Sequence, residues 1–149
     1  MSDFRSGLPV RLFDEDNLPY TEDNPLPVSL EESEGDEIHD YKVDEDVAAH
    51  GASPASHEYT VSTGKKLNLK KVLFAGSGRM KVELQVEDSV GSGTFVSKAV
   101  AFSSTAKLSD EINLDTPLNV EAGVKVKVIK TNLDNLAQNL YTTIIGVEK

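Results

Sequence analysis

The stretch Arg79-Met80-Lys81-Val82-Glu83-Leu84-Gln85-Val86-Glu87 decides the fold class of this chain. Every second residue from Met80 to Val86 is apolar, and the residues between them are charged or carry an amide. Successive side chains of a β-strand point to opposite faces, so this spacing predicts a strand with one buried and one solvated face. Such a strand needs neighbours on both sides and a second layer beneath it, which predicts an antiparallel β-domain.

Comparable short segments recur from residue 59 to residue 149, separated by Gly, Pro, Asn and Ser. We expect about seven or eight strands of about four to nine residues. The segments are 58–62, 67–75, 79–87, 94–102, 111–114, 116–120, 124–130 and 140–147. No window of about twelve residues has a helical period. This pattern is typical of an all-β fold, an antiparallel β-sandwich of jelly-roll or Greek-key type.

Several details of these strands can be predicted. The adjacent Lys70 and Lys71 interrupt an alternating run and indicate a β-bulge, and residues 76–78 predict a hairpin turn into the central strand. In residues 94–102 we expect Phe95 on one face and Val96, Val100 and Phe102 on the other. In residues 140–147 we expect four residues to share one face: Tyr141, Thr143, Ile145 and Val147. Five lysines are predicted on solvated strand faces: Lys81, Lys98, Lys125, Lys127 and Lys130.

Charge divides the chain into two parts. Residues 1–58 contain 16 acidic and 3 basic residues, a net charge of −13, whereas residues 59–149 contain 9 acidic and 12 basic residues, a net charge of +3. We therefore predict an acidic, extended N-terminal arm and hinge over 1–58 and a β-sandwich domain over 59–149. An acidic arm disfavours nucleic acid and anionic membranes as partners and favours a basic protein surface.

The composition also bears on cellular location. The chain has no Cys, which excludes a disulfide framework and a thiol nucleophile and fits assembly in a reducing cytoplasm. Its first residues lack the pattern of a signal peptide, and no apolar run is long enough to span a bilayer. We expect no membrane association.

Two short apolar patches stand out in the acidic arm, at residues 8–13 and 24–30. Their prolines favour extended geometry and disfavour helix. The arm is either a solvated linker or a segment that becomes ordered on a partner by strand addition and charge pairing. Under the second interpretation the anchoring side chains are Leu8, Val10, Leu12, Phe13, Leu26, Val28 and Leu30.

No residue pattern predicts catalysis, a metal site or a cofactor. His39, His50 and His57 lack metal-ligand spacing, and residues 14–18 lack the central Gly and third ligand of a calcium loop. Asn132, Asp134 and Asn135 share a loop in which such residues can hold calcium or a sugar, but they are also ordinary turn formers, the interpretation that we favour.

Several segments of the chain resemble structural proteins of tailed-bacteriophage virions. They are Gly7-Leu8-Pro9-Val10-Arg11-Leu12-Phe13-Asp14, residues 24–30, residues 61–72 and 78–86, Asp115-Thr116-Pro117-Leu118 and Thr131-Asn132-Leu133-Asp134-Asn135. The resemblance spans most of the chain and contains no invariant motif.

The resemblance implies a non-enzymatic capsid decoration (cement) protein on the virion exterior, assembled in the host cytoplasm. It also implies that the partners are the major capsid protein and neighbouring copies of the same chain, with a trimer as one arrangement. The alternative is a receptor- or glycan-binding module of a head fibre, tail fibre or baseplate. In that module the loops at residues 89–93 and 132–139 would bind the ligand.

Overall fold

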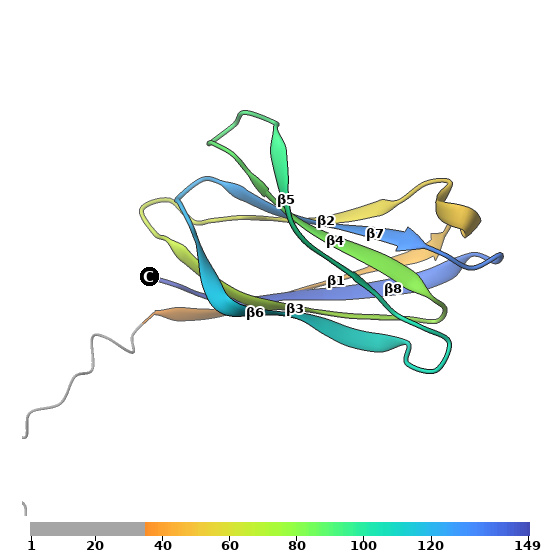
Figure 1. Cartoon of the computed structure of the whole chain (residues 1–149). Coiled ribbons are helices and arrows are strands. Elements are labelled where there is room, and N and C mark those ends of the chain that lie inside the picture. Colours follow the sequence, from red (N-terminus) through yellow and green to blue (C-terminus); the bar gives the residue numbers. More distant parts are fainter. Residues whose placement is uncertain (1–34) are drawn as a thin grey trace, which may run out of the picture. The chain divides into compact units, whose positions relative to one another are not determined.

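The structure is a computed structural model that describes residues 35–149, and these residues form a β-sandwich (Figure 1). The strands are β1 (Asp36–Val47), β2 (Ala55–Thr60), β3 (Leu67–Gly76), β4 (Met80–Glu87), β5 (Phe95–Phe102), β6 (Ser109–Val120), β7 (Lys125–Asn132) and β8 (Gln138–Glu148). A single short 3₁₀ turn, η2 (Ala49–Gly51), lies between β1 and β2 in this part of the chain. The predicted all-β fold is confirmed.

The two sheets have the strand orders β1-β8-β3-β6 and β2-β7-β4-β5, and every neighbouring pair is antiparallel. Strand β4 pairs with β5, β3 with β6, β2 with β7 and β1 with β8, so the chain folds as one long antiparallel ribbon that is rolled into two layers. This arrangement is the jelly roll. We call the first sheet the β1–β6 sheet and the second the β2–β5 sheet, after their edge strands.

The core lies between the sheets and is built from the alternating residues of the inner strands. Met80, Val82 and Leu84 of β4 are fully buried, and Val126 and Val128 of β7 face them from the next strand. The apolar face of residues 79–87 therefore points inward, as the alternation predicts.

The domain boundary predicted at residues 58 and 59 is wrong. Strands β1 and β2, which lie in the predicted arm, are edge strands of the two sheets, and β1 pairs with β8 over most of its length. Pairing with β8 satisfies the backbone groups along one edge of β1, and two of the charged residues that suggested a solvated segment, Asp40 and Asp44, are inward positions with partners on β2 and β7. The arm is thereby shortened to residues 1–34, which lie outside the described residues.

Four smaller predictions have different outcomes. The bulge at Lys70 is confirmed, since the register of β3 shifts between Leu69 and Lys71 against both neighbours. The hairpin at residues 76–78 is wrong, because this turn connects β3 to β4 in the opposite sheet. The segments 111–114 and 116–120 form one irregular strand, β6. The predicted faces of residues 94–102 are wrong, because a register shift opposite Leu84 and Gln85 places Phe95 on the outward face with Val100 and Phe102 and Val96 on the other face.

Candidate functional site

The predicted arm anchors cannot be placed. Leu8, Val10, Leu12, Phe13, Leu26, Val28 and Leu30 all lie outside the described residues. Within residues 35–149, no group of three or more His, Asp or Glu side chains is arranged to hold a metal ion. No helix of this region has the length and apolar character needed to cross a bilayer.

His57 is buried between the sheets and serves a structural role. Its Nε2 lies 2.7 Å from Asp40 Oδ2 on β1, and its Nδ1 lies 2.8 Å from Thr142 Oγ1 on β8. The geometry fits a neutral ring that donates from Nε2 to the carboxylate and accepts from the hydroxyl. Burial lowers the pKa of His57, and the neighbouring Asp40 only partly opposes this shift.

Lys130 is fully buried, so its predicted position on a solvated face is wrong. It follows Val126 and Val128 at the same two-residue spacing and points between the sheets, where its Nζ lies 2.7 Å from Asp44 Oδ2. Burial alone would raise the pKa of Asp44, but the bonds from Lys130 and Lys42 outweigh it and lower the pKa. The pair joins β1 of one sheet to β7 of the other.

The Asn132–Asn139 loop uses its polar side chains internally. Asn132 is buried and its amide donates to the carbonyls of Val47 and Leu136. The carboxylate of Asp134 accepts from the backbone N–H and the Nε of Arg79, at 2.7 and 2.8 Å. The side chains of Asn132 and Asp134 are thus engaged in hydrogen bonds within the protein, which agrees with the interpretation that these residues form a turn.

The Ser89–Gly93 loop is held in a similar way at the opposite end of the sandwich. Glu87 accepts hydrogen bonds from the backbone N–H groups of Gly93 and Lys125, at 3.0 and 3.3 Å. The bond from Gly93 lowers the pKa of the Glu87 carboxyl. This loop follows the C-terminal end of β4, whereas Asn132 pairs with Met80 at the beginning of β4, so the two loops do not form one site.

An apolar patch lies on the outward face of the edge strand β5 and consists of Val100 and Phe102, whereas Val96 pairs with Val86 and lies on the opposite face of the strand. All three side chains are exposed, and Phe102 is 60% exposed. Val100 and Phe102 share the outward face of the β2–β5 sheet with Glu83 and Lys81, their partners on β4. Phe95, on the same strand, is covered by Lys127, whose Nζ lies 4.5 Å from the ring centroid.

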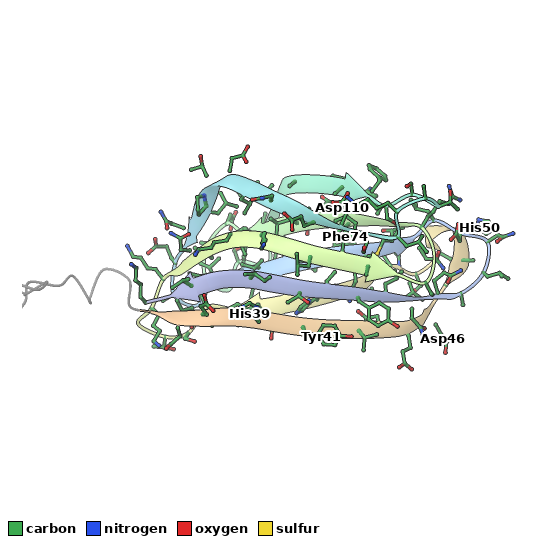
Figure 2. All side chains as sticks on the ribbon, turned by 90° about the horizontal axis from the view of Figure 1, so that it is seen from below. His39, Tyr41, Asp46, His50, Phe74 and Asp110 are labelled. Atoms are coloured by element: carbon green, nitrogen blue, oxygen red, sulfur yellow. The ribbon has the colours of Figure 1, made fainter. Side chains whose placement is uncertain are left out.

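A concavity of about 730 Å³ lies on the outward face of the β1–β6 sheet. Tyr41 of β1 and Tyr141 of β8 form one wall, and their nearly parallel rings have centroids 6.5 Å apart. The opposite wall is polar and belongs to β6 and the turn before it; its charged residues are Lys107, Asp110 and Glu111. In Figure 2, Tyr41 lies on the β1 side of this face and Asp110 on the β6 side.

The floor of the concavity is formed by the central strands of the sheet. Leu73 on β3 is opposite Thr143 on β8, and Ala75 is opposite Tyr141. The side chains of Leu73, Ala75 and Thr143 are shorter than those of the wall residues Tyr41 and Tyr141, and this difference in length forms the hollow. The partners of Leu73 and Ala75 on β6 are Glu111 and Ser109.

Sequence reasoning found only part of this concavity. The spacing of residues 140–147 correctly places Tyr141 and Thr143 on one face. Tyr41 was assigned to the arm, so the aromatic pair was missed. The inward positions of β1 are Ile38, Asp40, Lys42 and Asp44, at a spacing of two residues. Only one of them is apolar, so the sequence shows no hydrophobic alternation that would predict a strand here.

Comparisons with known proteins add no relative. No protein-family model, no curated protein and no solved structure matches the chain. The fold and its surfaces are therefore the basis for a functional assignment.

Proposed function

We propose that this protein is a non-enzymatic structural protein of a tailed-bacteriophage virion, a capsid decoration protein on the outer surface of the shell. Its partners would be the major capsid protein and neighbouring copies of itself. The proposal is supported by the resemblance of the arm and strand segments to virion proteins and by the surface of the described domain.

The exposed apolar edge strand β5 is the observation that carries the proposal. Edge strands with exposed large apolar residues are sites of association, and soluble monomers usually protect them with charge or prolines. β5 contains Val96, Val100 and Phe102, all exposed, and one charged residue, Lys98. A protein that packs beside copies of itself or on a capsid subunit would bury this strand.

The N-terminal arm is proposed as the second contact with the capsid. Residues 1–34 carry 9 acidic and 2 basic residues, a net charge of −7, and contain all seven proposed anchors. An apolar side chain buried on a partner contributes roughly 1.5–3 kcal/mol, and the acidic residues favour a basic surface. Because β1 and β2 belong to the sandwich, the proposed arm is shortened from residues 1–58 to residues 1–34, and it still contains all seven proposed anchors.

The proposal is tested by mass spectrometry of virions purified from cells that express the gene. A decoration protein should remain with particles through density-gradient purification at a copy number comparable to that of the shell subunit. Cryo-electron microscopy of the same particles should then show the sandwich on the outer surface. A protein that is absent from purified particles would refute the proposal.

Binding of a glycan or receptor by the loops at residues 89–93 and 132–139 receives less support. The two loops lie at opposite ends of β4, and the side chains of Asn132 and Asp134 are engaged in internal hydrogen bonds.

A further inference from the structure

We propose that the concavity on the β1–β6 sheet binds carbohydrate. This inference concerns a sheet face and neither of the loops discussed above, and it does not depend on the virion role. The concavity is open to solvent, so it would contact one side of a ligand and would not enclose it.

The aromatic wall suits the apolar face of a sugar ring. Tyr41 is 58% exposed although it lies in a strand, and it packs against Tyr141 with an angle of 22° between the ring planes. Tyrosine combines a flat apolar surface with a hydroxyl, and its ring loses little conformational freedom on binding. A pyranose has C–H groups on its faces and hydroxyls at its edge, so it can pack on one tyrosine ring while its edge remains available for hydrogen bonds.

The polar wall suits the hydroxyls of the same ligand. Glu111 is oriented by Asn113, whose Nδ2 donates to its Oε2 at 3.2 Å. Glu111 pairs with Leu73 of the floor, so its side chain is on the outward face, whereas the neighbouring Asp110 pairs with the buried Phe74. The Glu111 carboxylate can accept hydrogen bonds from hydroxyls, and a bond to an ionised acceptor is stronger than one between neutral groups.

The charge balance favours a neutral ligand over a cationic one. The Nζ of Lys107 lies 3.5 Å from Asp110, and the Nζ of Lys71 lies 3.9 Å from Glu111. Each carboxylate therefore already has a cation beside it, so a cationic peptide would gain little additional attraction. A polyhydroxylated ligand can donate to Glu111 and accept from Lys107 without disturbing these pairs.

The experiment is a titration of the full chain, followed by ¹H–¹⁵N correlation spectra and calorimetry. The probes are maltohexaose, cellohexaose, N-acetylchitohexaose and 3′-sialyllactose, each up to about 10 mM, which would saturate a site with a Kd near 1 mM. Hexalysine serves as the cationic probe. The variants are Tyr41→Ala and Glu111→Gln, with Phe102→Ala as the matched control, because Phe102 is an equally exposed aromatic residue on the other sheet.

We expect at least one saccharide to bind and to shift the resonances of Leu73, Ala75 and Thr143. Tyr41→Ala should weaken that binding about tenfold, which corresponds to about 1.4 kcal/mol, and Glu111→Gln should weaken it less. Phe102→Ala should leave it unchanged.

Three results would overturn the proposal: no binding by any of the four saccharides, binding that shifts resonances only in residues 88–94 or 132–139, or binding of hexalysine instead. The virion role is measured separately on purified particles, so either proposal can fail without the other.

Discussion

Replacing Asp44 with alanine should destabilise the domain strongly, because the substitution leaves the charge of Lys130 buried without a counter-ion. The side chain of Lys130 is 0% exposed, and its Nζ lies 2.7 Å from Asp44 Oδ2. Its other contacts are the carbonyls of Lys42 and Leu140, at 3.2 and 3.4 Å, which accept hydrogen bonds but carry no net charge. Removing one partner of a buried ion pair costs about 3–5 kcal/mol.

The exposure of the Asp44 side chain determines where in this range of energies the loss of stability caused by Asp44→Ala should fall. The Asp44 side chain is 20% exposed, so water can partly replace the carboxylate, and we expect the lower end, about 3 kcal/mol. Lys130→Met is the matched control, since it removes the charge and keeps a side chain of similar volume. Lys130→Met also removes one partner of the pair, but the Asp44 carboxylate that it leaves is 20% exposed and not fully buried, so we expect a smaller loss of stability, about 1 kcal/mol. Asp44 would keep Lys42, whose Nζ lies 3.3 Å from Oδ1.

The assay is urea denaturation at pH 7, followed by circular dichroism and analysed by linear extrapolation. The double variant Asp44→Ala/Lys130→Met should be more stable than Asp44→Ala alone, because it no longer buries an unpaired charge. The coupling energy of the cycle should be about 2 kcal/mol. If Asp44→Ala costs less than about 1 kcal/mol and the cycle shows no coupling, the inference that Lys130 is a buried, charged residue is wrong.

Three further predictions concern His57, Gly78 and strand β1. Because the pKa of His57 is lower in the folded chain, the unfolded chain binds more protons at this residue near pH 6.5 than the folded chain does. The contribution of His57 to stability is therefore present above that pH and is lost as the pH falls below it. In urea denaturation, His57→Gln should reduce the loss of stability between pH 7 and about pH 5, and an unchanged slope would contradict a neutral, buried ring. Gly78→Ala would place a Cβ against Asp134 Oδ2 and the side chain of Gln138 and should cost about 1–3 kcal/mol in the same assay; an unchanged stability would show that Asp134 does not pack there. In limited proteolysis, the protected fragment identified by mass spectrometry should begin at or before Gly35, and a fragment beginning near Ser56–Tyr59 would contradict the pairing of β1 with β8.

The inner strands could be predicted from sequence because their alternation is regular. Apolar and polar residues alternate without interruption from Met80 to Val86 and from Val124 to Val128, and all of the apolar residues except Val86 are buried. The bulge at Lys70 was also predictable, since an extra charged residue within an alternating run shifts the inward positions by one. These features are local, and a two-residue period is sufficient to detect them.

Strand β1 could not be predicted in the same way. In β1 the inward positions include Asp40 and Asp44, whose partners His57 and Lys130 lie 17 and 86 residues away in the sequence. A buried polar residue that is satisfied by a distant partner has the same local sequence signature as a solvated one. The burial of Lys130 and the aromatic pair of the concavity depend on which strands become neighbours, and pairing is not visible in the spacing of any one strand.

Co-sedimentation tests the central claim, that the protein decorates a capsid and needs its acidic N-terminal segment, in addition to strand β5, to remain attached. The full chain and a chain lacking residues 1–30 would be mixed with particles that have been stripped of the protein, after circular dichroism has shown that the truncated chain keeps its β-structure. The account predicts that the full chain sediments with the particles and that the truncated chain remains in the supernatant. Equal sedimentation of the two chains would contradict the claim.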